Sequence, residues 1–300
     1  MSVVALLCRE GIPFAREVSL ARISSIRCGG TASLWIQPRC IGELVRTLHL
    51  LTEGGIPFRT VGAMTNTLAP DGALPYPLLS TARVCECEDL GDAVRLGCGA
   101  RLATVAHRFM KEGRDVLSAL STVPGTVGGA VRGNAGAFGH ATEEYVREAC
   151  VFDPSKRALV TLGPDELSFS YRDSILKHTE SILVSVTLHA KACSAAVMAA
   201  KEAEHKARRH ATQPREPSLG SIFLRTEDGV PAARLIDACG LKGMRIGDAC
   251  VSPMHAGFIV NLGAATATDV RALIDYVKDC VYERYRVSLT PEICLLPKEI

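Results

Sequence analysis

The chain has 300 residues, of which 47% are hydrophobic and 22% are charged, and its formal net charge at pH 7 is +2. These values are typical of a globular protein that is long enough for two domains. The mild charge gives no reason to expect a nucleic-acid or membrane partner, although a local basic pocket could still bind a small anion.

The twelve cysteines form no Cys-x-x-Cys pair and have no histidine-rich spacing, so the sequence predicts no metal site. Most are expected to be small buried hydrophobes, as in Ala249–Val251 and Ile293–Leu295, and a disulfide framework is not expected. The apolar stretch Val3–Leu7 has no basic region before it, and no window approaches the length of about eighteen apolar residues that would span a membrane. We therefore expect a soluble, cytoplasmic protein.

Apolar spacing and turn residues predict three blocks of alternating strands and helices, typical of an α+β fold with several domains. The first block is a small βαβ unit, and a solvated helix followed by Pro214 and Pro217 marks a probable boundary before the third. The long helix of the third block opens with the capping-box pattern Thr266-x-x-Asp269. The predicted strands are Leu34–Pro38, Phe58–Val61, Val84–Cys87, Val94–Gly97, Glu148–Asp153, Ile182–His189 and Ser288–Leu296, and the predicted helices are Ile41–Thr52, Leu102–Lys111, Leu117–Thr122, Ser194–His210 and Ala232–Ala238.

The segment Pro124–Gly139 holds six glycines in sixteen residues. Glycine loses the most backbone freedom on folding, so this density favours a loop whose N–H groups close on a ligand such as a phosphate. The alternative is a connector between strands. The segment is not a Walker A loop, and Gly97-x-Gly99 is a poor Rossmann fingerprint because Leu102 replaces its third glycine. The turn Gly62–Asn66 is either a second contact for the same ligand or an ordinary tight turn.

Taken together, these motifs resemble, in order, the signatures of the UDP-N-acetylenolpyruvoylglucosamine reductase family, from about residue 15 to 297. Pro124–Gly139 is similar to its flavin loop, and Gly62–Asn66 lies where the family has a Gly-x-Gly-Ser-Asn turn. The segments Glu17–Pro38, Leu167–Ser174, Gly220–Phe223, Gly240–Gly243, Ser252–Asn261 and Pro291–Glu292 resemble its remaining signatures.

The resemblance implies a two-part FAD-binding domain of the vanillyl-alcohol-oxidase-like class and a smaller α/β substrate-binding domain. The implied boundaries are 1–67 and 68–207 for the two FAD-binding subdomains, 208–287 for the substrate domain and 288–300 for a C-terminal strand that returns to the active site. The implied cofactor-binding residues are Gly62, Ala63, Met64, Thr65, Asn66, Thr67, Pro124, Gly125, Thr126, Gly128, Gly129, Asn134, Gly136 and Ala137.

The implied catalytic residues are Arg172, Ser221 and Glu292. Taken alone, Arg172 could be a structural partner of a carboxylate, Ser221 an inert turn residue and Glu292 an outward-facing strand residue. The resemblance instead predicts that Arg172 and Glu292 stabilise an enolate and that Ser221 donates a proton to it. Weaker candidates for substrate contacts are Tyr171, Arg225, Lys242, His255 and Asn261, of which His255 could equally be structural and Lys242 a solvated loop residue.

The implied reaction uses FAD and NADPH to reduce UDP-N-acetylglucosamine enolpyruvate to UDP-N-acetylmuramate for peptidoglycan synthesis, in an enzyme expected to be monomeric. A flavin oxidase of the same class, a non-catalytic UDP-sugar-binding protein and a flavin-free scaffold are alternatives. The chain departs from the family pattern at Met64, Thr65, Ser118, Phe138 and Leu224. Because methionine disfavours a positive φ, Met64 leaves the geometry of the first turn open.

Overall fold

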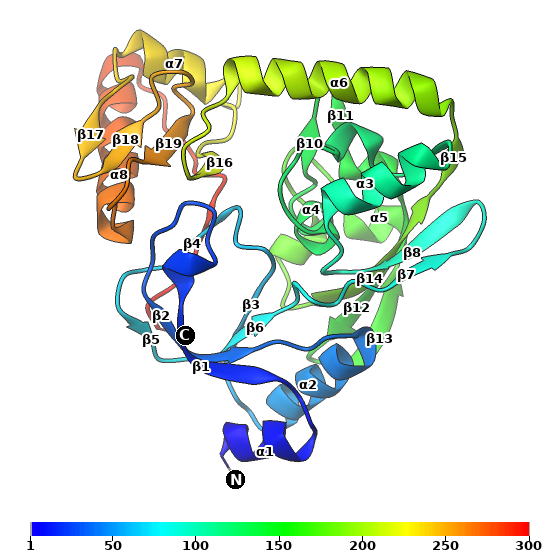
Figure 1. Cartoon of the computed structure of the whole chain (residues 1–300). Coiled ribbons are helices and arrows are strands. Elements are labelled where there is room, and N and C mark those ends of the chain that lie inside the picture. Colours follow the sequence, from blue (N-terminus) through cyan, green and yellow to red (C-terminus); the bar gives the residue numbers. More distant parts are fainter. Residues whose placement is uncertain (1, 300) are drawn as a thin grey trace. The chain divides into compact units, whose positions relative to one another are not determined.

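The computed structural model describes residues 2–299, which form two compact units (Figure 1). Unit 1 comprises the residues up to Arg16, Leu34–Ala63 and Pro77–Ala207. Unit 2 comprises Glu17–Ser33, Met64–Tyr76 and the residues from Arg208 onward. Each unit is therefore assembled from segments that are far apart in the sequence. The elements that run from one unit into the other are β1 (Phe14–Ser19), β2 (Thr31–Ile36) and α6 (Ala195–Thr212).

The remaining elements of unit 1 are mostly short. Its helices are α1 (Val3–Arg9), α2 (Ile41–Glu53), α3 (Leu102–Lys111), α4 (Val127–Arg132) and α5 (Pro164–Leu167), with 3-10 helices η2 (Ser118–Leu120), η3 (Thr142–Glu144) and η4 (Ile175–Lys177). Its strands are β3 (Arg59–Val61), β6 (Leu78–Ser80), β7 (Cys87–Asp89), β8 (Ala93–Gly97), β9 (Arg114–Asp115), β10 (Gly136–Ala137), β11 (His140–Ala141), β12 (Val146–Asp153), β13 (Ala158–Leu162), β14 (Ile182–His189) and β15 (Lys191–Ala192).

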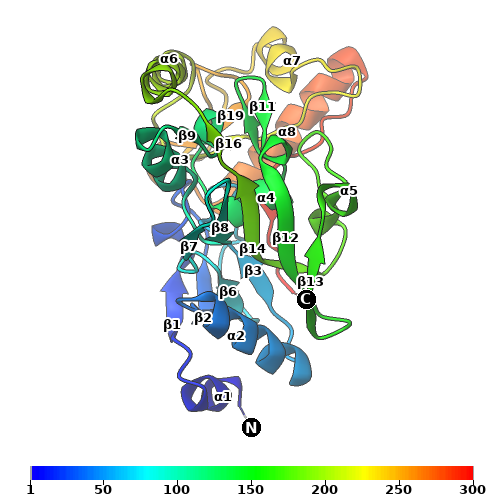
Figure 2. The same cartoon turned by 90° about the vertical axis from the view of Figure 1, so that its right-hand side faces the viewer.

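Two sheets organise unit 1. In the first, β6 lies between β2 and β3 and runs parallel to both. Since α2 connects β2 to β3, the predicted βαβ unit is confirmed, with β6 inserted between its strands. The second sheet is antiparallel in the order β13-β12-β14-β8-β7, and α4 packs on β14 (Figure 2). The face of α2 formed by Leu44, Leu48 and Leu51 is buried, as their i, i+4, i+7 spacing predicts.

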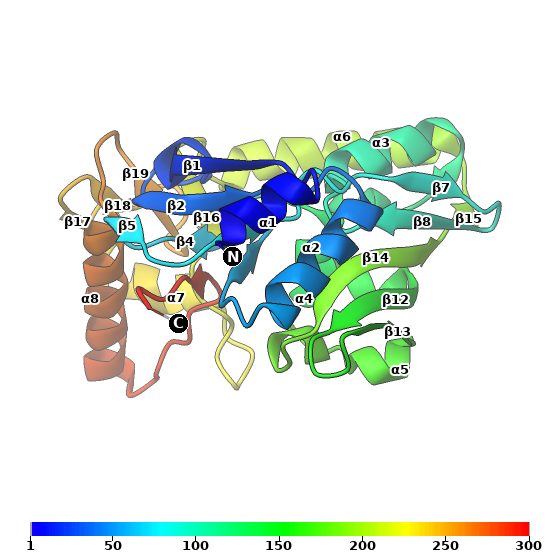
Figure 3. The same ribbon diagram turned by 90° about the horizontal axis from the view of Figure 1, so that it is seen from below.

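Unit 2 is built around one antiparallel sheet in the order β16-β19-β18-β17, and the long helix α8 packs on β17 and β18 (Figure 3). The capping box at the start of α8 is confirmed, because Thr266 Oγ1 accepts from the Asp269 N–H and Asp269 accepts from the Thr266 N–H. The elements of unit 2 are η1 (Leu20–Arg22), β4 (Thr67–Leu68), β5 (Ala73–Leu74), β16 (Ser218–Ser221), α7 (Ala232–Ala238), β17 (Arg245–Ile246), β18 (Ala249–Val251), β19 (Phe258–Asn261), α8 (Ala267–Tyr285) and β20 (Cys294–Leu295).

Three predicted elements are wrong in extent. The helix expected at Leu117–Thr122 is only the single turn η2, since Leu117 has a left-handed backbone with φ +59°. The strand expected at Val84–Cys87 begins only at its last residue. The strand expected at Ser288–Leu296 shrinks to β20 and one bridge at Pro291, which has no N–H to donate to a ladder.

The cysteines are only partly as expected. All twelve are free thiols, and no cluster of metal-ligating side chains occurs among residues 2–299. Burial was predicted for most, but only Cys28, Cys98 and Cys250 are buried. Of the two examples taken from apolar runs, Cys250 lies inside the unit 2 sheet and Cys294 is exposed on the short strand β20. In the same part of the chain, every helix is too short or too polar to cross a membrane.

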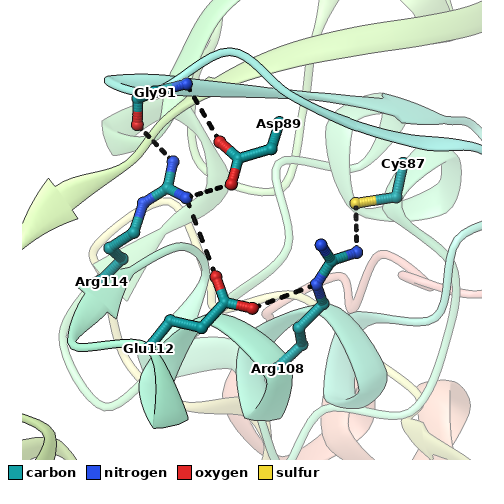
Figure 4. Close-up of polar contacts among 6 residues, drawn as sticks. All are labelled: Cys87, Asp89, Gly91, Arg108, Glu112 and Arg114. Carbon is teal, nitrogen blue, oxygen red and sulfur yellow. Dashed lines mark hydrogen bonds and ion pairs between the residues drawn. The ribbon is translucent and has the colours of Figure 1, made fainter.

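A surface network joins α3 to the β7–β8 hairpin (Figure 4). Arg114 contacts Asp89 at 2.6 Å and Glu112 at 3.8 Å, and Arg108 contacts Glu112 at 3.3 Å and the Cys87 thiol at 3.3 Å. These groups are mostly exposed, so each pair contributes little to stability. The network lies at the β7 edge of the sheet.

Asp71 joins the segment Met64–Tyr76 to α8 within unit 2. Its carboxylate accepts hydrogen bonds from the N–H of Ala267 (3.0 Å), the N–H of Thr268 (2.8 Å) and the hydroxyl of Thr268 (2.7 Å). Burial by itself would raise the pKa of the Asp71 carboxyl, but these hydrogen bonds outweigh it and lower the pKa below its ordinary value. The carboxylate also faces the positive end of the helix.

Asp71→Ala should lower the melting temperature by an amount equivalent to about 1 kcal/mol, as for other lost helix caps. Asp275→Ala, at an exposed position of the same helix, is the matched control and should change stability by less than about 0.5 kcal/mol. Because the pKa of Asp71 is depressed in the folded state, its contribution is present above the unfolded-state pKa and is lost as the pH falls through the folded-state pKa. The stabilities of the wild type and Asp71→Ala should therefore converge as the pH falls. A stability difference that widened in acid would contradict this assignment.

Candidate functional site

The glycine-rich segment is fixed by main-chain hydrogen bonds to the end of β8 and the residues after it. The N–H of Val127 donates to the Ala100 carbonyl (2.8 Å) and the N–H of Gly128 donates to the Cys98 carbonyl (2.7 Å). Thr126 caps α4, since its hydroxyl accepts from the N–H of Gly129 (3.2 Å). The first N–H groups of α4, including those of Gly128 and Gly129, therefore already have partners inside the protein.

Two glycines of this segment are required for close packing. A Cβ on Gly128 would lie 2.8 Å from the Cys98 carbonyl oxygen, and a Cβ on Gly136 would lie 2.6 Å from the His140 carbonyl oxygen and 2.8 Å from Arg172 Nη1. All three distances are shorter than real Cβ contacts allow. The high glycine content thus reflects close backbone approach at these positions.

The two glycine turns predicted to bind one ligand do meet in unit 1. A Cβ on Gly62 would lie 2.9 Å from Thr126 Oγ1, so the end of β3 and the start of α4 are in contact. The backbone at Met64 keeps a left-handed conformation, with φ +52°, and the side chain is buried. The turn therefore keeps a positive φ at Met64, although a methionine side chain disfavours that conformation.

Asn134 is a buried scaffold residue of unit 1. Its amide donates to the Ser170 carbonyl (2.8 Å) and accepts from the N–H of Glu143 (3.1 Å), which links the glycine-rich segment to the Tyr171–Arg172 turn. The neighbouring Phe138 stacks on His205 of α6, with ring centroids 3.8 Å apart and an interplanar angle of 3°. Phe138, which replaces the tyrosine of the family pattern, thus stacks through the face of its ring.

Arg172 lies at the tip of a two-residue turn. Ser170 and Asp173 exchange both backbone hydrogen bonds at 3.1 Å, and Arg172 between them has φ +57°. The guanidinium donates to the carbonyls of Gly136 (2.7 Å) and Asn134 (3.4 Å), and it also contacts the Tyr171 ring. The predicted catalytic arginine therefore lies directly against the glycine-rich segment.

Ser221 and Glu292 lie on neighbouring backbone segments of unit 2. Phe223 forms a bridge with Pro291, the N–H of Glu292 donates to the Ile222 carbonyl (2.7 Å), and the N–H of Leu224 donates to the Thr290 carbonyl (3.0 Å). The Ser221 hydroxyl donates a long hydrogen bond to the Phe223 carbonyl (3.4 Å). Residues about seventy positions apart in the sequence are thus brought side by side.

Asn66 connects this pair to the first glycine turn. Its side-chain amide donates to the Glu292 carbonyl (3.3 Å), and its own carbonyl accepts from the N–H of Cys294 (2.8 Å). The next residue, Thr67, pairs with Cys294 in the parallel β4–β20 ladder. Asn66, predicted to bind the cofactor, therefore also fixes the backbone that carries Glu292.

The weaker substrate candidates differ in their surroundings. Asn261 is buried and its amide is occupied by the carbonyl of Ile26 (2.9 Å) and the N–H groups of Gly263 and Ala265, so it is a scaffold residue and its prediction as a substrate contact is wrong. His255 Nδ1 accepts from the Gly257 N–H (3.1 Å), and burial lowers the pKa of its ring.

The other three candidates lie nearer the surface. Lys242 forms an ion pair with Asp237 (2.7 Å). Arg225 donates to the Gly229 carbonyl (3.1 Å), and Tyr171 is exposed. These side chains remain candidates for contacts with an anionic substrate.

Lys177 was not found from the sequence. Its ammonium donates to the Arg172 carbonyl, five residues earlier in the chain. A lysine at the end of a polar loop carries no distinctive pattern, and only the conformation of the turn reveals its contact.

Comparisons with known proteins agree with this arrangement. A family model described as UDP-N-acetylenolpyruvoylglucosamine reductase, C-terminal domain, matches residues 213–296, and one described as FAD binding domain matches residues 32–160. A UDP-N-acetylenolpyruvoylglucosamine reductase from Caldicellulosiruptor saccharolyticus is 37% identical over 285 residues, which cover 94% of this chain and 91% of the relative. The chain belongs to the UDP-N-acetylenolpyruvoylglucosamine reductase family.

Solved structures support the same conclusion. The crystal structure of UDP-N-acetylenolpyruvylglucosamine reductase from Thermus caldophilus aligns with a TM-score of 0.80 and 30% identity, covering 95% of this chain and all of that one. A berberine-bridge-enzyme-like protein from Physcomitrella patens aligns with a TM-score of 0.51 and 14% identity over 64% of this chain and 45% of its own, and so shares the fold alone. The predicted α+β class with an FAD-binding domain is confirmed.

Unit 1 fits a bound flavin nucleotide. A Cβ at Gly62 would lie 2.9 Å from Thr126 Oγ1, so the two turns approach closely only because Gly62 has no side chain. Gly125, with φ +141°, adds a backbone conformation that side chains rarely adopt. Since the first N–H groups of α4 are occupied, we assign the cofactor cradle to Gly62, Ala63, Gly125 and Thr126, and the later glycines to packing.

Gly128→Ala should destabilise unit 1 by about 1–3 kcal/mol, as overpacking does, and reduce the FAD that copurifies. The matched control is Gly129→Ala, one residue on, where a Cβ would lie at an ordinary 3.5 Å from Thr126 Oγ1. Thermal melting and flavin absorbance of both variants test the assignment. Equal losses in the two variants would show that the Cys98 contact does not decide the packing.

Proposed function

We propose that this protein reduces UDP-N-acetylglucosamine enolpyruvate to UDP-N-acetylmuramate with NADPH and FAD, in peptidoglycan precursor synthesis. The observation that supports this most is the placement of Ser221 beside Glu292 in the part of the chain that matches the reductase C-terminal domain. An FAD-binding domain alone is compatible with many oxidoreductases. A serine and a glutamate on paired backbone segments of a substrate domain favour a reduction that ends in protonation of carbon.

The bound flavin would supply the hydride chemistry, taking a hydride from NADPH and delivering it to the vinyl carbon of the substrate. Addition at that carbon leaves negative charge on the carboxylate side, as an aci-carboxylate. We assign stabilisation of this charge to the Arg172 guanidinium, which is always cationic and is held rigidly by the Gly136 and Asn134 carbonyls. Glu292, protonated and donating a hydrogen bond, completes the stabilisation.

Ser221 is the proposed proton donor. Its hydroxyl hydrogen points to the Phe223 carbonyl over a long 3.4 Å bond, so little is lost when it turns to a substrate. A serine is a weak acid near neutral pH and can donate only to a strongly basic carbon, which the aci-carboxylate provides. Tyr171, Arg225, Lys242 and His255 are proposed to contact the sugar, the phosphates or the nicotinamide. We further propose that the protein works as a cytoplasmic monomer, where NADPH and nucleotide sugars are available.

The assignment is tested by an absorbance spectrum of the purified protein, followed by anaerobic addition of NADPH and then of the enolpyruvyl substrate. We expect a flavin band that bleaches with NADPH and returns with the substrate. A band that returns with oxygen but not with the substrate would indicate a flavin oxidase. A colourless protein that FAD cannot reconstitute would leave only a binding protein.

Ser221→Ala should leave bleaching by NADPH unchanged and slow the substrate-dependent return of the flavin band by about 100- to 10,000-fold, the usual contribution of a positioned acid. Ser218→Ala, in the same strand β16, is the control and should slow neither step. Stopped-flow absorbance separates the two half-reactions. A Ser221→Ala variant with a normal return of the band would exclude this serine as the donor.

A further inference from the structure

The backbone at Arg172 is in a conformation that needs support. With φ +57°, the residue lies in the left-handed region, which costs a side-chain-bearing residue about 1 kcal/mol or more. If the turn relaxed to a negative φ, the direction of the side chain would change and the guanidinium would leave the carbonyls of Gly136 and Asn134. The position of the arginine therefore depends on whatever holds the peptide after it.

The ammonium of Lys177 holds that peptide, because it donates to the Arg172 carbonyl. A hydrogen bond from a charged donor is stronger than one between neutral groups. The second support is Asn134, whose amide donates to the Ser170 carbonyl (2.8 Å) on the other side of the turn. The turn is thus held at both ends, and Lys177 holds the end that follows the arginine.

Lys177 is itself in a fixed position. It ends the 3-10 turn η4, in which Leu176 is buried in the core of unit 1 and the Lys177 N–H donates to the Ser174 carbonyl (3.0 Å). The Ser174 hydroxyl is buried and donates to the Arg132 carbonyl at the end of α4 (2.8 Å). The stem of the lysine therefore starts from a segment that is anchored on α4, the helix within the glycine-rich segment.

We propose that Lys177 is a positioning residue for Arg172. It acts through the arginine carbonyl, and it keeps the left-handed turn that aims the guanidinium at developing negative charge on the substrate. This role rests on the function proposed above for Arg172. Lys177 would thus affect the chemistry without contacting the substrate.

The test replaces the ammonium and keeps the stem, as Lys177→Met, with Lys177→Arg as the conservative variant and Lys201→Met, at an exposed position of α6, as the control. In stopped flow with FAD-loaded enzyme, Lys177→Met should leave reduction by NADPH unchanged. The return of the flavin band with the enolpyruvyl substrate should slow by roughly 10- to 100-fold, as expected for a displaced supporting group. Lys177→Arg should recover most of the rate, and Lys201→Met should match the wild type.

A double-mutant cycle with Arg172→Met makes the test specific. If Lys177 acts only through the arginine, Lys177→Met should cause no further loss when Arg172 is already methionine. Losses that multiply, or equal slowing of both half-reactions, would overturn the proposal and indicate general damage to the fold. If the wild-type flavin band never returns with the substrate, the proposed function itself has failed. If the wild-type band returns and the Lys177→Met variant matches it, only the proposal for Lys177 has failed.

Discussion

The close contact between the main chain of Gly128 and the Cys98 carbonyl is the constraint on which the rest of unit 1 depends. The Gly128 nitrogen lies 2.7 Å from the Cys98 carbonyl oxygen, and only a residue without a Cβ fits at this position of α4. At the end of α4, the Arg132 carbonyl accepts a hydrogen bond from the Ser174 hydroxyl. The Asn134 amide donates to the Ser170 carbonyl, and the Gly136 carbonyl accepts from the Arg172 guanidinium. Hydrogen bonds thus connect this packing contact to Arg172, the proposed catalytic cation.

The two units contribute different chemistry. Unit 1 provides a cation that is held against the carbonyls of Asn134 and Gly136. Unit 2 carries Ser221 and Glu292 on two segments that are joined by backbone pairing around Phe223 and Pro291. Asn66 belongs to the glycine turn in sequence, yet it secures the Glu292 backbone.

Much of this could be predicted from the sequence where local patterns decide the structure. The helices at Leu102–Lys111 and Ala232–Ala238, the strand at Ile182–His189 and the Thr266 capping box follow from periodicity and capping, and the structure confirms them. The motifs located Arg172, but not the left-handed turn or Lys177, because a positive φ at a non-glycine residue is imposed by distant partners. Asn261 could not be assigned for the same reason, since its amide is occupied by backbone more than two hundred residues earlier.

The most direct test of the central claim follows the proton. Turnover in deuterium oxide with NADPH and the enolpyruvyl substrate, with the product examined by NMR and mass spectrometry, reports what was added to the carbon next to the carboxylate. If Ser221 is the donor, as proposed, its hydroxyl exchanges with solvent and delivers the proton from one side, so the account predicts one deuterium at that carbon in a single configuration. An unlabelled carbon, or a mixture of both configurations, would contradict protonation by a positioned serine.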